Sequence, residues 1–171
     1  MLNKSNEQKI SGHTRLYAVI GNPVRHSLSP ALQTAAFRET GIDAVMLAFE
    51  ADTDNLEQVV ESLKTLDSPG WNVTMPCKGR MAELCDELTR EAQLTGSVNT
   101  VVNRDGKLIG HSTDGIGLMR HLQASGIDIR NRKIVIAGAG GAAASIAAAA
   151  SGIASEVVIA NRTTRKAEEL A

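Results

Sequence analysis

The sequence predicts an α/β fold. Short apolar runs rich in valine and isoleucine alternate with segments whose apolar residues recur every three or four positions, as expected for strands joined by helices. Hydrophobic residues make up 43% and charged residues 22% of the chain, values typical of a globular protein with a buried core. Aromatic residues make up only 2%, so we expect that core to be aliphatic.

The first part of the chain predicts three strands, each followed by a helix. Ser29 and Pro30 are typical of the first residues of a helix, and Gly41 is typical of the residue that ends it. Asp54 is expected to cap the second helix, whose apolar residues at 3–4 spacing form one buried face. The expected strands are 16–20, 44–50 and 71–74, and the expected helices are 29–40, 55–66 and 79–88.

A hairpin is predicted next, because Asp105-Gly106 lies between the apolar runs 97–102 and 107–109 and this dipeptide is a strong hairpin signal. The sheet is therefore expected to be mixed, with parallel strands joined by helices and one antiparallel pair. A helix from 114 to about 125 follows, with Thr113 as its expected cap. We expect a disordered tail (1–14), a first domain (15–127) and a second domain (128–171).

The second domain predicts a strand at 133–137, a helix at 142–151 and a strand at 156–160, and a further helix begins near Thr163. A parallel sheet of two strands has two apolar faces and two unpaired edges, whereas parallel sheets are normally covered on both faces. We therefore expect the chain to contain only the first half of a doubly wound domain and to be a fragment of a longer protein.

A glycine-rich turn follows the strand at 133–137 directly, at 138–143 (GAGGAA). It fits the G-x-G-x-x-A fingerprint of a Rossmann-type domain, in which glycines permit the tight turn and let a pyrophosphate approach the start of the helix. We therefore expect a dinucleotide here; the alternative is a helix of small residues that packs closely for structural reasons alone. The residues expected to bind the cofactor are Gly138, Gly140, Gly141, Ala142 and Ala143.

The residues after the strand at 156–160 favour NADP over NAD. NAD sites usually have an acidic residue at this point, which binds the ribose 2′-hydroxyl. Residues 161–166 instead contain three cations and no acid, and an arginine can hold a 2′-phosphate through charge-assisted hydrogen bonds. The alternative, a solvated helix start, conflicts with the helix dipole. NAD is kept as the second choice, and the cofactor site is extended by Asn161, Arg162, Thr163 and Arg165.

Several classes of function are disfavoured. The formal net charge is -1, without the basic excess of a nucleic-acid-binding surface. No apolar run is long enough to span a membrane, and the polar N-terminus has no apolar signal segment. The four histidines and the two cysteines, Cys77 and Cys85, lack metal-ligand spacing, so no metal is expected. Two cysteines are typical of reduced thiols in a cytoplasmic protein.

A series of short polar motifs carries a family resemblance. The segments are 21–30 (GNPVRHSLSP), 72–78 (NVTMPCK), 96–100 (GSVNT), 113–115 (TDG), 138–142 (GAGGA) and 161–163 (NRT). Their content and order resemble those of shikimate dehydrogenases, over roughly residues 15–171. One departure is Ser112, because the family usually has asparagine before the TDG motif.

The resemblance implies an NADP-dependent oxidoreductase that reversibly reduces 3-dehydroshikimate to shikimate in aromatic amino-acid biosynthesis. It implies that Lys78 and Asp114 are the catalytic pair, with Lys78 as acid/base. Ser27 and Ser29 lie near a helix start, which favours the substrate carboxylate, although these hydroxyls could also cap the helix. Asn72 lies on the same strand face as Thr74 but could instead stabilise the local turn, and Thr113 could cap its helix or contact the substrate. The substrate-binding residues that the resemblance implies are Ser27, Ser29, Thr74, Lys78, Asn99 and Asp114.

Two other functions stay open at this stage. A quinate/shikimate dehydrogenase that uses NAD or NADP resembles the sequence in the same motifs. A non-catalytic binding fragment is the third hypothesis, because the chain ends early, at Ala171. A folate-linked dehydrogenase is disfavoured by the motif at 72–78. The expected partners are small molecules (shikimate, 3-dehydroshikimate or quinate), and the oligomeric state is left open, with a homodimer as one option.

Overall fold

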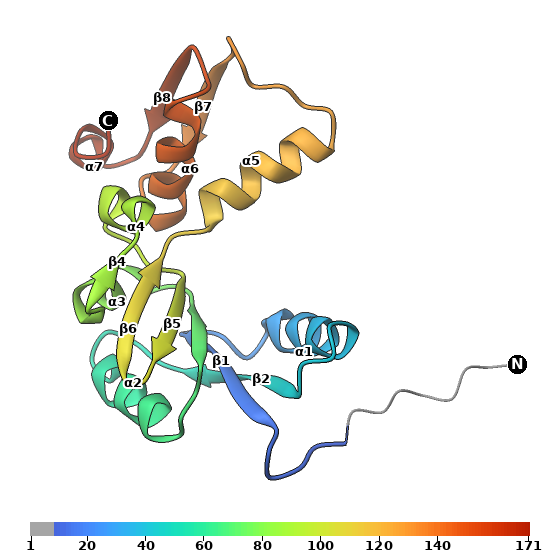
Figure 1. Cartoon of the computed structure of the whole chain (residues 1–171). Helices are drawn as coiled ribbons and strands as arrows, with labels where there is room; N and C mark the ends of the chain where they lie inside the picture. The colour runs from blue at the N-terminus through green and yellow to red at the C-terminus, as the bar shows by residue number, and fades with distance from the viewer. Residues whose placement is uncertain (1–8) are drawn as a thin grey trace, which may run out of the picture.

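The computed structural model describes residues 9–171 and shows an α/β architecture with two separate sheets (Figure 1). Residues 1–8 of the expected tail lie outside the described residues, and residues 11–14 of that tail form a turn in which the Thr14 N–H donates to the Ser11 carbonyl at 3.2 Å. The elements are β1 (Arg15–Gly21), α1 (Ser29–Glu39), β2 (Ala44–Glu50), α2 (Leu56–Thr65), β3 (Gly70–Val73), α3 (Lys78–Leu84), β4 (Glu87–Leu88), α4 (Arg90–Thr95), β5 (Thr100–Arg104), β6 (Lys107–His111), α5 (Asp114–Ala124), β7 (Lys133–Ala137), α6 (Gly141–Ser151), β8 (Glu156–Ala160) and α7 (Thr164–Glu168).

The larger sheet is mixed, as the sequence predicts, with the strand order β2-β1-β3-β5-β6-β4. The pairs β1–β2, β1–β3 and β4–β6 are parallel. The predicted hairpin is β5–β6, with Arg104 opposite Lys107. The prediction of a single antiparallel pair was wrong, because β5 also pairs antiparallel with β3. The hairpin therefore continues the central sheet and does not form a separate ribbon.

The topology brings four loops to one edge of this sheet. β1 and β3 are parallel, so their carboxyl ends, Gly21 and Val73, lie at the same edge. β5 starts at that edge, because Thr100 is opposite Asn72, and β6 ends there, because His111 is opposite Thr100. The loops after β1, β3 and β6 and the loop before β5 therefore meet, and ligands of such sheets bind at this kind of edge.

The main core holds this edge in place. α2 and α3 cover one face of the sheet, and α1 covers the other, where Tyr17 and Phe37 stack with their ring centroids 4.9 Å apart. Each fully buried large apolar side chain contributes about 1.5–3 kcal/mol, so the start of α3 is firmly anchored. The largest fully buried side chains include Trp71, Ile20, Leu56, Met81 and Val98.

Two local predictions on helices need correction. Asp54 does not cap α2; the N-cap is Asn55, and the Asp52 carboxylate accepts the N–H groups of Asp54 and Asn55. The helix expected at 79–88 ends at Leu84, where Cys85 turns to an extended backbone. Residues 87–88 instead pair with β6 as β4, and α4 follows. Tertiary pairing here overrides the local helical pattern.

The smaller sheet consists of the parallel strands β7 and β8 with α6 packed against them, a βαβ unit of the Rossmann type. Gly138 has φ +126°, a conformation that favours glycine and permits the tight turn between β7 and α6. Ala143 and Ala147 of α6 are buried against Ile136 of β7. α5 connects the two sheets and lies across α6 (Figure 1).

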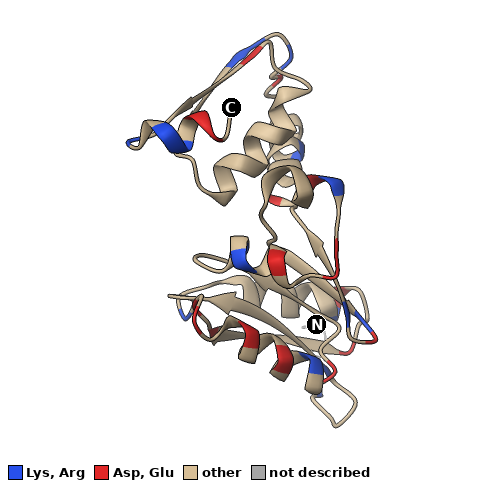
Figure 2. Ribbon diagram, turned by 90° about the vertical axis from the view of Figure 1, so that its left-hand side faces the viewer, with Lys and Arg blue, Asp and Glu red and all other residues tan. Residues whose placement is uncertain are grey.

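Charged residues are spread over both parts of the molecule, with Lys and Arg interspersed with Asp and Glu (Figure 2). α6 is an exception, because it contains no charged residue. Between residues 9 and 171, no helix is both long and apolar enough to cross a membrane.

Candidate active site

An ion pair between Lys78 and Asp114 lies at the loop edge of the larger sheet. Lys78 is the first residue of α3 and Asp114 is the first residue of α5. Lys78 Nζ donates to Asp114 Oδ2 at 2.5 Å. The two side chains are 21% and 33% exposed, so a small molecule can reach the pair while the protein shields most of it. The structure therefore brings the predicted catalytic residues together.

Asn99 holds the other oxygen of this carboxylate. Its Nδ2 donates to Asp114 Oδ1 at 2.6 Å and to Thr113 Oγ1 at 3.0 Å. Its Oδ1 accepts the Thr113 N–H at 3.0 Å and the Thr100 hydroxyl at 3.2 Å. Thr113 is at the N-cap of α5, but its hydroxyl contacts Asn99 and makes no capping bond. In this structure the Asn99 amide therefore orients Asp114.

The loops after β1 and β3 carry the remaining predicted substrate residues. A Cβ on Gly21 would lie 2.3 Å from Thr74 Cγ2, so only glycine lets these two loops touch. Ser27 Oγ accepts the Ser29 N–H at 3.2 Å, whereas the expected cap by the Ser29 hydroxyl is not found and Leu28 is at the N-cap. Ser27, Ser29 and Thr74 are all half-buried, and their loops lie along the same edge as Lys78.

The glycine turn has an open backbone. Gly140 is at the N-cap of α6, and no side chain caps the helix. A Cβ at Gly138 or Gly140 would meet nothing within 4 Å. Gly141 differs, because a Cβ there would lie 2.6 Å from Ser97 Oγ and 3.7 Å from Lys78 Cδ. The first residue of α6 is therefore next to the lysine of the ion pair.

The predicted cofactor residues after β8 have different local roles. Asn161 Nδ2 donates to the Thr163 carbonyl at 2.9 Å and shapes the turn into α7. Arg165 forms an ion pair with Glu169, with Nε 2.7 Å from Oε1. Arg162 is exposed and makes no ion pair within residues 9–171. Arg162 is thus the cation of this group whose guanidinium is available to an anion.

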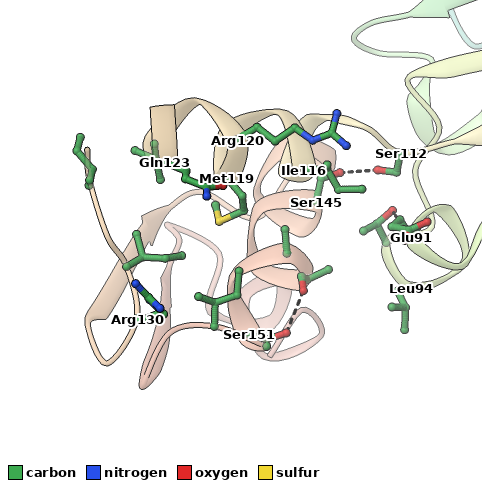
Figure 3. A pocket seen from close by; sticks show the side chains of 18 of the residues that line it. Glu91, Leu94, Ser112, Ile116, Met119, Arg120, Gln123, Arg130, Ser145 and Ser151 are labelled. Atoms are coloured by element: carbon green, nitrogen blue, oxygen red, sulfur yellow. Dashed lines mark hydrogen bonds between the residues drawn. The ribbon is translucent and has the colours of Figure 1, made fainter. Parts of the chain in front are cut away.

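Sequence reasoning missed a contact between the two parts of the molecule. The hydroxyls of Ser112 and Ser145 lie 2.6 Å apart and are buried. The sequence gives two signals, a serine inside an alanine-rich helix and Ser112 in place of the asparagine that the family usually has, and neither indicates the other. Both serines line a cavity of about 940 Å³ between α4, α5 and α6 (Figure 3). Lys78 and Asp114 do not line it, so this cavity is separate from the ion pair.

Neither cysteine has the environment of a nucleophile. Cys77 is buried, and its Sγ donates to the Ala51 carbonyl at 3.2 Å. Burial raises the pKa of the Cys77 thiol, and the nearby Asp52 raises it further. Burial also raises the pKa of Cys85 to about 11, with a smaller contribution from Asp86. Within the described residues, no group of three or more His, Cys, Asp or Glu side chains could hold a metal ion.

A family model and the curated relatives point to one family. Residues 19–101 match the family described as shikimate dehydrogenase substrate binding domain. The shikimate dehydrogenase (NADP(+)) of Alkaliphilus metalliredigens is 52% identical over 165 residues, which are 96% of this chain and 58% of that protein.

Two solved structures extend the similarity to the fold. The Listeria monocytogenes shikimate 5-dehydrogenase in complex with shikimate and NAD has a TM-score of 0.88 and 44% identity, over 95% of this chain and 57% of that one. The Thermus thermophilus shikimate 5-dehydrogenase in complex with NADP(H) and shikimate has a TM-score of 0.86 and 35% identity, over 92% of this chain and 59% of that one.

The chain therefore spans about 58% of the length of the curated relative described above. Over nearly all of its own length, both its sequence and its arrangement of strands and helices follow those of the relatives. The matched region includes the Lys78–Asp114 pair as well as the glycine turn. The chain belongs to the shikimate dehydrogenase family.

Proposed function

We propose that this protein is an NADP-dependent shikimate dehydrogenase that reversibly reduces 3-dehydroshikimate to shikimate. The observation that carries the proposal is the Lys78–Asp114 ion pair at 2.5 Å, next to the glycine turn that opens α6. Conversion of a ketone to a hydroxyl needs a group that transfers a proton to the oxygen, close to a source of hydride. The substrates in the relatives' names support the same chemistry.

Lys78 is assigned the proton transfer. In the reduction, the carbonyl oxygen takes a proton from the Lys78 ammonium as the carbon takes the hydride, and in the oxidation the amine recovers that proton. Asp114 holds Nζ in position through Oδ2. Asn99 binds the other carboxylate oxygen, so a rotation of the carboxylate away from Lys78 would break this hydrogen bond as well.

The glycine turn and the cations after β8 are assigned to the cofactor. A bound nicotinamide supplies or accepts the hydride. The open backbone at Gly138 and Gly140, with the N–H groups of the first helical turn, suits a pyrophosphate. The exposed Arg162 suits a 2′-phosphate. The other residues assigned to the cofactor form the start of α6 and the turn into α7. They are Gly141, Ala142, Ala143, Asn161, Thr163 and Arg165.

The substrate is assigned to the four loops at the sheet edge. Ser27 and Ser29, at the start of α1, are proposed to bind the carboxylate of shikimate. Thr74 and Asp114 are proposed to bind its ring hydroxyls, with Lys78 at the reacting oxygen. Both amide hydrogens of Asn99 face protein groups, so we infer that Asn99 contributes to substrate binding chiefly by orienting Asp114.

A matrix of initial rates tests the function. Wild type and Lys78→Met are assayed with shikimate or quinate and with NADP or NAD. Methionine keeps an unbranched stem but carries no proton, so kcat is expected to fall by about 10²–10⁴-fold with little change in the Kd for shikimate. Lys107→Met is a matched control, because Lys107 forms an ion pair with Glu87 on strand β4, away from the site. A Lys78→Met variant within tenfold of wild type would refute the assigned role.

The same matrix separates the alternatives. Turnover that is faster with quinate than with shikimate, or faster with NAD than with NADP, would favour a quinate/shikimate dehydrogenase. Saturable binding of shikimate by a wild-type chain that shows no turnover would favour a binding function without catalysis. Fastest turnover with shikimate and NADP is the result expected from the proposed function.

We further propose a division into domains 15–127 and 128–171, a homodimer and a cytoplasmic location. The separate sheets support the division, and limited proteolysis between β6 and β7 tests it. The exposed Leu47 and Phe49 on the edge strand β2 support self-association, which light scattering tests. The two free cysteines support a reducing compartment, which fractionation of cells tests.

A further inference from the structure

The helix that begins at the glycine turn makes a second contact one turn later. Ser145 follows Gly141 by four residues, so both lie on one side of α6. Ser145 Oγ is 2.6 Å from Ser112 Oγ, and each serine is 5% exposed. Figure 3 shows this hydrogen bond between α6 and the residue that follows β6. Ser112 is only two residues before Asp114.

The backbones of α5 and α6 also touch at this point. A Cβ on Gly115 would lie 1.9 Å from the Ser145 carbonyl oxygen and 2.9 Å from Ala149 Cβ. Gly115 directly follows Asp114, and Gly141 abuts the Lys78 stem. One side of α6 therefore lies against Lys78 and against Gly115, the residue that follows Asp114.

The Ser112–Ser145 hydrogen bond fixes the register of this contact. The other side chains along this side of α6 are glycine and alanine, whose packing is not directional. Hydrogen bonds weaken steeply with distance and angle. A slide or rotation of α6 would leave two buried hydroxyls without a partner, which is costly. The register in which both serines are satisfied is therefore strongly favoured.

We propose that Ser145 is a positioning residue that, through its hydrogen bond to Ser112, aligns the glycine turn of α6 with Lys78 and Asp114. This inference rests on the proposed function and names the contact that sets the distance between the hydride source and the proton donor. Rates are sensitive to such distances, because a misplacement of about 1 Å can cost about 10²-fold.

Kinetics of the 171-residue chain provide the first measurement. Ser145→Ala is expected to lower kcat by about tenfold, as for loss of one hydrogen bond, with the Kd for shikimate unchanged. Gly115→Ala forces the helices apart and is expected to lower kcat by about 10²-fold. Ser151→Ala is the matched control on the same helix, because the exposed Ser151 hydroxyl donates only to the Ala148 carbonyl. It is expected to match wild type.

Competitive acetylation of lysines, followed by peptide mass spectrometry, provides a second measurement that needs no turnover. Because the start of α6 lies next to the Lys78 stem and the Lys78 side chain is only 21% exposed, the reactivity of Lys78 relative to Lys64 and Lys107 is expected to rise severalfold in Ser145→Ala and to stay constant in Ser151→Ala. Absent turnover in wild type would count against the proposed function alone, because the labelling decides on Ser145 independently. Unchanged labelling of Lys78 in folded Ser145→Ala would overturn the inference, whatever its melting temperature and whether or not Gly115→Ala folds.

Discussion

Alanine substitutions at the neighbouring glycines 140 and 141 should have opposite consequences. Gly140 has φ −98° and ψ −176°, an extended conformation that any residue adopts, and a Cβ there meets nothing within 4 Å. At Gly141 the added Cβ lies 2.6 Å from Ser97 Oγ, well inside normal contact. Ser97 is buried, so it cannot swing out into solvent. One substitution adds a methyl group to open space, whereas the other adds it to a packed contact.

The expected magnitudes follow from these surroundings. Overpacking costs about 1–3 kcal/mol, and each 1 kcal/mol lowers the Tm of a chain of this length by about 2–4 °C. Gly141→Ala should therefore melt several degrees below wild type. Gly140→Ala should stay within about 1 kcal/mol of wild type, because alanine restricts the unfolded chain but is a poorer N-cap residue than glycine. Its methyl group projects where a phosphate would approach, so the Kd for NADPH should rise by about tenfold or more.

Two measurements on purified variants check this pair. Melting is followed by circular dichroism, and NADPH binding is followed by the fluorescence of the nicotinamide. The reasoning is refuted if Gly141→Ala melts with wild type, or if Gly140→Ala binds NADPH with the affinity of wild type. A loss of stability in Gly140→Ala as large as that in Gly141→Ala would mean that the turn is packed and not open.

Three further predictions concern the site and the thiols. Asp114→Asn should lower kcat by about 10²-fold or more, because an amide carries no charge and would present an NH2 donor to Lys78 or Asn99 in place of one carboxylate oxygen; initial rates within tenfold of wild type would contradict this role. Arg162→Ala should raise the Kd for NADP by about tenfold and leave that for NAD unchanged in fluorescence titrations; equal weakening would remove the 2′-phosphate assignment. Because the pKa of Cys85 is raised to about 11, its reaction with a disulfide reagent should be slow at pH 8 and accelerate toward pH 11. The Cys85 thiol ionises at a lower pH in the unfolded chain than in the folded protein, so the free energy of unfolding should fall as pH rises from about 9 to 11. Fast labelling of Cys85 at pH 8 would contradict the burial of its thiol.

Local sequence signals predicted the elements that depend on local interactions. The hairpin followed from Asp105-Gly106, whose φ values are both positive, as a two-residue turn requires. The turn at Gly138 followed from glycine spacing between a strand and a helix, and its φ of +126° gives the physical reason. The pairing of Lys78 with Asp114 was different, because it came from a family resemblance and joins residues that are 36 positions apart.

Features that depend on tertiary contacts could not be predicted in this way. β4 has only two residues and forms because Asp86 and Leu108 exchange hydrogen bonds, with the Asp86 carboxylate accepting the Leu108 N–H at 2.7 Å. No local pattern distinguishes this stretch from the end of a helix. The Ser112–Ser145 bond likewise joins residues 33 positions apart, and a serine in an alanine-rich helix does not indicate its partner.

The alanine-rich composition of α6 has a physical explanation in its two packed sides. Ala143 and Ala147 pack on β7, while Ser145 and Ala149, offset by two positions, face α5. A helix with larger residues on either side would move away from one of its neighbours, because helix axes separate as side chains grow. If α6 moved away from α5, the glycine turn would move away from Lys78. If α6 moved away from β7, the turn between β7 and α6 would open. In the sequence, this run of small residues indicates only a helix. In the structure, the small residues let α6 pack closely on both β7 and α5, and α6 therefore holds the glycine turn beside the Lys78–Asp114 ion pair.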